Sequence, residues 1–302
     1  MLYALFTAML WSVAGFSSSR ISRIFGAARA NALRLTGATL VLLLIVALRG
    51  RLQWIPGTGF FLLSGILHLA IGDIGLFAVY RRLGPRIGAL AVSCLAPLVA
   101  LLVEWVWLGT VIPLKQLFLA ALVLASVVLA VAPRERKHLS PKELKLGILA
   151  GLVATLGQGS SGAVTRMGYA ALETANTSAG PWMPALLRCA AGAAGVGIYL
   201  LWQSWRQRGN PQGVTDLLPH RRIEGHPLVW LTASTLLGPV AGVLMVMKAY
   251  ESTPAALVHA VLAILPVLMI PVAWFFDGNT PSRRSIVCGI LAVALVMRMI
   301  LI

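Results

Sequence analysis

Ionisable residues inside apolar stretches are the first candidates for chemistry in this sequence. Asp73 lies within a long apolar run, about two helical turns before a basic turn at residues 81–86. A charged group in a lipid bilayer is costly and often marks a solute or proton pathway. Two roles therefore fit Asp73. It is either a protonatable carboxylate that lines a cavity and couples proton movement to solute, or the partner of a nearby arginine.

Glu104 is the second acidic candidate, and it lies near the end of the next apolar run. A role in proton coupling is one hypothesis for Glu104. The position near a helix end favours another, in which the carboxylate reaches the membrane interface or pairs with a basic loop residue.

Two histidines also fall within apolar runs. His68 precedes Asp73 by five residues, which on a helix offsets the two side chains by roughly 140°. A hydrogen-bonded structural role is therefore favoured for His68, and a shared cavity with Asp73 needs a broad face. His259 lies seven residues before Pro266, close to two turns, so one face of a helix is expected to carry both.

Prolines interrupt two of the apolar runs at related places. Pro97 and Pro266 each lack a backbone donor and leave a carbonyl free, so each predicts a helix kink. The freed carbonyls would contact solute or water under one interpretation. Under the other, the kinks only fit the helices together.

Further polar and aromatic residues have both a structural and a functional interpretation. Arg34 and Arg188 could attract an anionic solute, although a salt bridge or a carbonyl contact is favoured. Gln158 lies within the sequence GQGSSG, which either lets a helix pack closely or leaves room for solute. Trp11 and Tyr250 could stack on a solute, and interfacial anchoring is the commoner use of such rings.

Composition shows which elements must position these residues. Hydrophobic residues make up 59% of the chain, charged residues 11%, and mean hydropathy is +0.87. Soluble domains are typically about 45–50% apolar and about 25% charged. We therefore predict an all-α, multi-pass membrane protein, because backbone groups in lipid must be satisfied within each segment. Ten apolar segments are expected: Leu2–Ser18, Ala32–Leu48, Gly59–Tyr80, Ile87–Leu108, Gln116–Ala132, Leu146–Arg166, Trp182–Trp202, Pro227–Tyr250, Pro254–Phe276 and Ser285–Ile302.

The chain is strongly basic, with 25 Lys and Arg against 9 Asp and Glu. These basic residues lie mainly in loops between apolar runs, which favours anionic lipid headgroups over nucleic acid as their partner. Loops after odd-numbered segments hold 17 of them and the opposite side holds 6, so the positive-inside rule places the richer side in the cytoplasm. Both termini would then face outward.

The two halves of the sequence resemble each other. Adding 169 to six positions of the first half reaches identical residues: Pro85, Ala91, Pro97, Val103, Trp105 and Gly109 match Pro254, Ala260, Pro266, Val272, Trp274 and Gly278. We therefore predict two five-helix repeats, residues 1–133 and 146–302, joined by a basic polar linker at residues 134–145. Because five is odd, the repeats must have opposite orientations, as in many secondary transporters with a central cavity.

Specific motifs then point to a family. They are Gly72-Asp73, Phe77-Ala78, Arg81-Arg82-Leu83-Gly84-Pro85, mid-helix Pro97 and Leu108-Gly109, together with Trp11 and Arg34. With these motifs the chain resembles the EamA-type members of the drug/metabolite transporter superfamily over nearly its whole length. One departure is Thr110, where the family often has an acidic residue; in the second half Asp277 precedes Gly278 instead. The resemblance implies a ten-helix carrier of small organic solutes with a central cavity, no prosthetic group, and both termini in the cytoplasm, which conflicts with the charge bias.

The predicted function is secondary-active transport of small organic solutes across a plasma membrane, the inner membrane of a bacterium, and export driven by proton exchange is one hypothesis for it. The sequence determines neither the coupling ion nor the direction of transport. The alternative is a membrane-embedded lipid-modifying enzyme or a scaffold without transport activity. No HExxH, CxxC, GxSxG or GxxxxGK pattern supports an enzyme, and neither a metal nor a cofactor is predicted. Cys94, Cys189 and Cys288 all lie in apolar runs and are expected to be packing residues. The sequence indicates neither the solute nor the oligomeric state.

Overall fold

The computed structural model describes residues 1–302 except residues 84, 132–139, 208–225, 278–281 and 302. Residues 134–139 of the predicted linker at residues 134–145 lie outside the described residues, whereas residues 141–145 begin a helix. Gly278 also lies outside the described residues. The described part contains helices only, which agrees with the predicted all-α class. In chain order these are α1 (Leu2–Phe25), α2 (Ala27–Leu48), α3 (Thr58–Gly65), η1 (Ile66–Gly72), α4 (Asp73–Leu83), α5 (Pro85–Leu108), α6 (Leu114–Val131), α7 (Pro141–Thr174), α8 (Trp182–Gln207), α9 (Pro227–Thr235), η3 (Leu236–Gly242), α10 (Val243–Ser252), α11 (Ala255–Leu262), α12 (Leu265–Asp277) and α13 (Arg283–Ile300).

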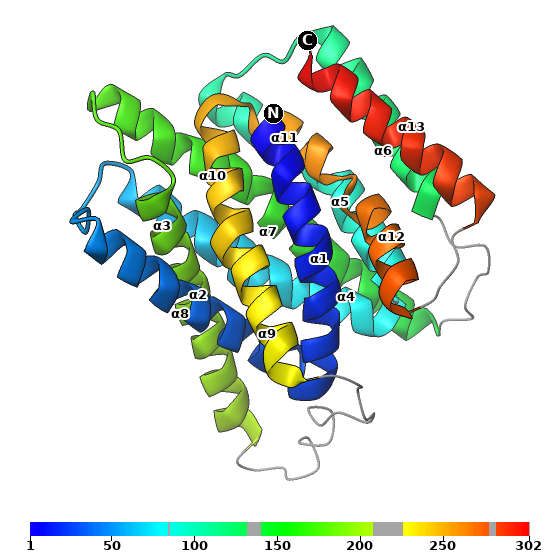
Figure 1. The fold of residues 1–302 in the computed structure, drawn as a ribbon, viewed down its shortest axis with the longest axis horizontal. Coiled ribbons are helices and arrows are strands. Elements are labelled where there is room, and N and C mark those ends of the chain that lie inside the picture. Colours follow the sequence, from blue (N-terminus) through cyan, green and yellow to red (C-terminus); the bar gives the residue numbers. More distant parts are fainter. Residues whose placement is uncertain (84, 132–139, 208–225, 278–281, 302) are drawn as a thin grey trace.

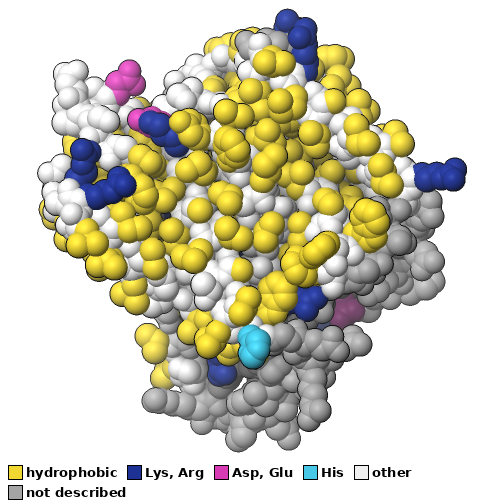
Figure 2. Space-filling view, viewed as in Figure 1, with side chains coloured by type: hydrophobic (Ala, Val, Ile, Leu, Met, Phe, Trp, Pro, Cys, Tyr) yellow, Lys and Arg dark blue, Asp and Glu magenta, His cyan; other side chains and the backbone are white. Residues whose placement is uncertain are grey.

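The outer surface of this bundle is apolar. Figure 2 shows hydrophobic side chains spread over the described part of one face, and large residues such as Leu44, Leu102 and Trp105 are 60% exposed. In the described residues, eight helices are long and apolar enough to cross a membrane, and Val92–Leu108 is a shorter apolar helix. These lengths suit a hydrocarbon slab about 30 Å thick. The chain is therefore a multi-pass membrane protein.

Several helices extend beyond the predicted apolar segments. The α7 helix is 34 residues long, whereas the sequence predicted only Leu146–Arg166. Its first turn is polar and begins at an N-cap, where the Ser140 side chain accepts a hydrogen bond from the Glu143 backbone N–H. At the other extreme, the tenth predicted segment is helical as α13 but is not among the eight candidate spans.

Two predicted helices contain a π-helical segment of seven residues. The predicted segment Gly59–Tyr80 divides into α3, η1 and α4, and Pro227–Tyr250 divides into α9, η3 and α10. In a π segment each backbone hydrogen bond spans five residues instead of the four of an α-helix, and such segments are often found at functional sites. Both π segments end in a glycine, Gly72 or Gly242, and both are followed directly by an α-helix. Because the same interruption recurs at the same place, the two halves share this irregular feature as well as their sequence matches.

The first helix of each half packs mainly against the other half. α1 contacts α9, η3, α10, α11 and α12, whereas α7 contacts α3, η1, α4 and α5. Two further pairs join the halves side by side, α2 with α8 and α6 with α13. Figure 1 shows α6 and α13 as a pair at one edge of the bundle, and both chain termini at the same end of the view. The halves are therefore interlaced rather than separate domains.

Glycines allow these helices to approach closely. A Cβ atom on Gly157 of α7 would lie 2.5 Å from the Leu67 carbonyl oxygen in η1, and one on Gly159 would lie 2.6 Å from the Val99 Cβ in α5. A side chain at either position would force the backbones apart. This finding supports close packing as the role of the small residues around Gln158.

Candidate functional site

Asp73 and Arg34 form a buried ion pair. The Arg34 Nη2 lies 2.7 Å from the Asp73 Oδ2, and the side chains are 13% and 8% exposed. Arg34 also donates to the Asn31 Oδ1 at 3.0 Å and to the Ser18 Oγ at 3.2 Å, and the Ser18 hydroxyl lies 2.6 Å from that of Ser234. This cluster connects α1, α2, α4 and α9. In this structure Asp73 is therefore the partner of an arginine, one of its two predicted roles. Its other role, in proton coupling, stays a prediction.

Arg188 forms a second cluster and is only 1% exposed. Its Nη1 donates to the Thr165 Oγ1 at 2.8 Å, and its Nη2 lies 2.8 Å from the His68 Nδ1 and 3.4 Å from the Ser161 Oγ. Because arginine only donates, the His68 Nδ1 accepts, which places that ring in its neutral form with the proton on Nε2. Every partner of Arg188 in the described chain is therefore uncharged. His68 has the expected hydrogen-bonded role, but it belongs to the cluster of Arg188 and not to that of Asp73.

Tyr250, His259 and Trp11 lie next to the Arg188 cluster. The Tyr250 ring centre is 6.0 Å from the Arg188 Cζ, and the Tyr250 hydroxyl lies 3.1 Å from the His259 Nε2. Trp11 meets His68 edge to face, with ring centres 5.7 Å apart, and its Nε1 donates to the Gly238 carbonyl oxygen at 3.2 Å. Tyr250 is fully buried, so interfacial anchoring is wrong for this ring. Trp11 is partly buried, and its role as an interfacial anchor stays a prediction. The bundle holds these rings around a polar interior.

Glu104 and Arg166 form a third buried group. The Arg166 Nε lies 2.8 Å from the Glu104 Oε1, and the Glu104 side chain is only 1% exposed. The other carboxylate oxygen accepts from the Ala255 N–H at 2.7 Å and the Ala256 N–H at 3.4 Å, so it caps the N-terminus of α11. The expectation that Glu104 reaches the interface is therefore wrong, because α7 and α11 pack over the end of α5. Its partner Arg166 lies inside α7 and not in a loop.

The two prolines lie in different helical surroundings. Pro97 is inside the continuous helix α5, whereas the corresponding second-half segment breaks at residues 263–264, between α11 and α12. Pro266 is buried in the first turn of α12, where a missing N–H costs little. His259 belongs to α11 and Pro266 to α12, so the two residues do not share the face of one continuous helix. Sequence matching aligned the prolines but could not detect the break.

Gln158 lies half-buried in α7, where it packs against the end of η1. A Cβ atom on Gly72 would lie 2.9 Å from the Gln158 Cγ, so the glycine makes room for this side chain. Gln158 therefore packs on the same π segment that carries His68. In the described residues, no group of three or more His, Cys, Asp or Glu side chains is arranged to hold a metal ion. The three cysteines are free thiols.

Sequence reasoning missed the hydroxyl and amide residues that complete these clusters. Thr165 and Ser161 bind Arg188, while Asn31 and Ser18 bind Arg34. Small polar residues within apolar helices are a weak signal, because most of them return their hydrogen bond to the preceding helical turn. The available signal was their spacing. Ser161 and Thr165 are four residues apart in α7 and therefore share one face.

Comparisons with known proteins agree with this architecture. The family model for the EamA-like transporter family matches residues 1–132 and 145–301. A solved structure, described only as "Crystal structure of protein", superposes with a TM-score of 0.72 at 17% sequence identity, covering 99% of this chain and 93% of that chain. This likeness shows the fold alone. Curated protein sequences gave no significant match. The family prediction from sequence motifs is confirmed: this chain belongs to the EamA-like transporter family.

Proposed function

We propose that this protein is a secondary-active transporter that moves small organic solutes across a plasma membrane, such as the inner membrane of a bacterium. The observation that carries the proposal is the family match over nearly the full chain. Its support in the structure is an apolar bundle whose buried ionisable groups cluster in the interior, where they contact residues from both halves. Polar clusters of this kind are rare in membrane helices unless they serve a solute or an ion.

Alternating access supplies the mechanism. α1 and α7 each pack on the third and fourth helices of the other half, as two inverted five-helix repeats would require. Rocking of one repeat against the other would then open the interior to each side of the membrane in turn. In the present conformation the polar side chains contact one another directly, so solute would enter when these contacts separate. Proton exchange at Asp73 would couple the movement to a gradient, because protonation weakens its ion pair with Arg34.

Transport by the purified protein in lipid vesicles tests this function. We expect at least one member of a broad panel of radiolabelled metabolites to move across the vesicle membrane faster than in protein-free vesicles. We also expect the rate to rise when a pH gradient is imposed. If no panel member moves above the protein-free rate, with or without the gradient, the proposed function is wrong.

Orientation in the membrane follows from the charge bias. We propose that the connections after the odd-numbered predicted segments, at residues 19–31, 81–86, 133–145, 203–226 and 277–284, face the cytoplasm, where anionic headgroups attract their basic residues. Both termini would then face outward; Figure 1 places them at the same end of the bundle. A reporter fused after Ile302 that is active only outside the cytoplasm should therefore be active. Activity of a reporter that works only in the cytoplasm, fused at the same position, would show that the orientation is the opposite one.

A further inference from the structure

Arg34 and Arg188 occupy corresponding positions in the two halves. α2, with Arg34, and α8, with Arg188, are the second helices of their halves, and they pack side by side. Adding 147 to Ala14 and Ser18 of α1 gives Ser161 and Thr165 of α7. Adding 170 to residues 66–72 of η1 gives residues 236–242 of η3. The same offset relates His68 to Gly238 and Asp73 to Val243.

The contacts of the two arginines follow this correspondence. The Nη1 of Arg34 donates to Ser18, and the Nη1 of Arg188 donates to Thr165, the residue that corresponds to Ser18. A Cβ atom on Gly238 would lie 3.7 Å from the Nη1 of Arg34, and His68, which corresponds to Gly238, contacts Arg188. Two duplicated arginine sites can therefore be compared residue by residue.

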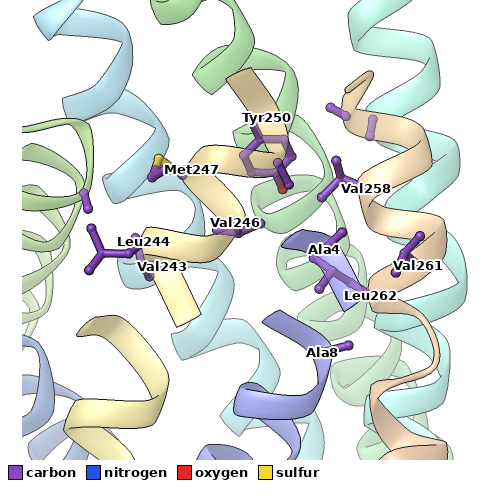
Figure 3. Packing of buried hydrophobic residues seen from close by; sticks show 14 of the residues in the cluster. Ala4, Ala8, Val243, Leu244, Val246, Met247, Tyr250, Val258, Val261 and Leu262 are labelled. Carbon is purple, nitrogen blue, oxygen red and sulfur yellow. The ribbon is translucent and has the colours of Figure 1, made fainter. Parts of the chain in front are cut away.

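The two sites differ in charge balance. At the first site Asp73 begins α4 and neutralises Arg34. At the second site the corresponding first residue of α10 is Val243, which is 1% exposed within an apolar cluster. Figure 3 shows Val243 and Leu244 at one end of α10 and Tyr250 toward the other. No carboxylate of the described chain forms a salt bridge with Arg188. Asp73 attracts Arg188 electrostatically but forms its salt bridge with Arg34, and the Arg188 Nε has no hydrogen-bond partner in the described chain.

A buried guanidinium without an anionic partner is strongly unfavourable. Neutral acceptors such as His68 and Thr165 satisfy some of its N–H groups but supply no negative charge. Arginine binds carboxylates through parallel N–H groups, and one unpaired cation matches one negative charge. We propose that Arg188 binds the carboxylate of an organic monocarboxylate solute, which supplies the negative charge that Asp73 supplies to Arg34. This inference rests on the proposed transport function and names the substrate class of the same interior site.

The neighbours of Arg188 also indicate the rest of the solute. The Tyr250 ring centre lies 6.0 Å from the Arg188 Cζ, and the Tyr250 side chain is fully buried. A buried aromatic ring beside one charged group favours a ligand with a single carboxylate on an apolar body. Benzoate and butyrate are therefore suitable probes, with benzamide and butyramide as uncharged counterparts of similar shape.

Equilibrium binding to the purified full-length protein in detergent tests the proposal without requiring transport. We expect benzoate or butyrate to bind the wild-type protein, and the matched amides to bind at least tenfold more weakly. In Arg188→Gln, carboxylate binding should weaken by about 10- to 100-fold, the range for loss of a hydrogen bond to a charged group. Carboxylate binding that is unchanged in Arg188→Gln would overturn the proposal, as would wild-type protein that binds neither carboxylate or prefers inorganic phosphate.

Val243→Asp gives an independent and more specific test. An aspartate at this position would give Arg188 the kind of internal carboxylate that Asp73 gives Arg34. Binding of an added carboxylate should then be lost while the protein stays folded. Asparagine has nearly the same shape as aspartate but carries no charge, so Val243→Asn should retain carboxylate binding. Equal binding by folded Val243→Asp and Val243→Asn would contradict the proposal, and if Val243→Asp does not fold, the Arg188→Gln comparison decides. Failure of transport in vesicles with retained binding would reject the proposed function but not the anion site.

Discussion

Replacement of Glu104 by alanine is expected to destabilise the protein by about 3–5 kcal/mol, the usual cost of breaking a buried ion pair from one side. The carboxylate is 1% exposed, and its removal leaves Arg166 inside the bundle without its partner. It also removes the cap from the Ala255 and Ala256 N–H groups at the start of α11. Since α5, α7 and α11 meet at this carboxylate, the loss should loosen the junction between the two halves. Reversible unfolding by SDS in mixed micelles would measure the change in unfolding free energy.

The ion pair between Lys248 and Glu251 offers a matched control. Its N–O distance is 2.6 Å, but its side chains are 39% and 30% exposed, and the residues are three positions apart on one helix. Exposed pairs of this kind typically contribute less than about 1 kcal/mol. Glu251→Ala should therefore change the unfolding free energy much less than Glu104→Ala. Equal effects of the two substitutions would show that burial of Glu104 does not govern its contribution.

The positions of the helices could be predicted from the sequence because long apolar runs have few alternatives in lipid. Helix ends were harder to place, since a polar first turn such as that of α7 extends beyond the apolar run. The π segments were not predicted, because one extra residue in a turn barely changes the hydrophobic pattern. Pro266 predicted a kink, but a complete break between α11 and α12 was not predicted, because both sides of it are apolar.

The ionisable residues of the candidate site were found from sequence because each is an exception within an apolar run. Their partners were not, since Arg34 and Asp73 are 39 residues apart, and His68 and Arg188 are 120 apart. Pairing at such separations depends on how the helices cross. Glu104 illustrates the limit: its place near a helix end suggested the interface, but helices from the other half cover it.

The ion pair between Arg34 and Asp73 allows the structural role of Asp73 to be separated from a role in proton coupling. Asp73→Asn should destabilise the protein by about 3–5 kcal/mol, because Arg34 is left buried without a counter-charge. Arg34→Gln should do the same by isolating the carboxylate. The double variant removes both charges, so its loss of stability should be smaller than the sum of the two single losses. SDS unfolding of the four proteins measures this interaction energy.

Transport by the same four proteins then distinguishes the two roles of Asp73. A carboxylate that only holds helices together should be dispensable once Arg34 is neutral, and the double variant would regain both stability and transport. A carboxylate that carries protons cannot be replaced by asparagine. We therefore expect the double variant to regain stability but to show no acceleration by a pH gradient. Wild-type rates and an unchanged pH dependence in the folded double variant would leave Asp73 with a structural role only.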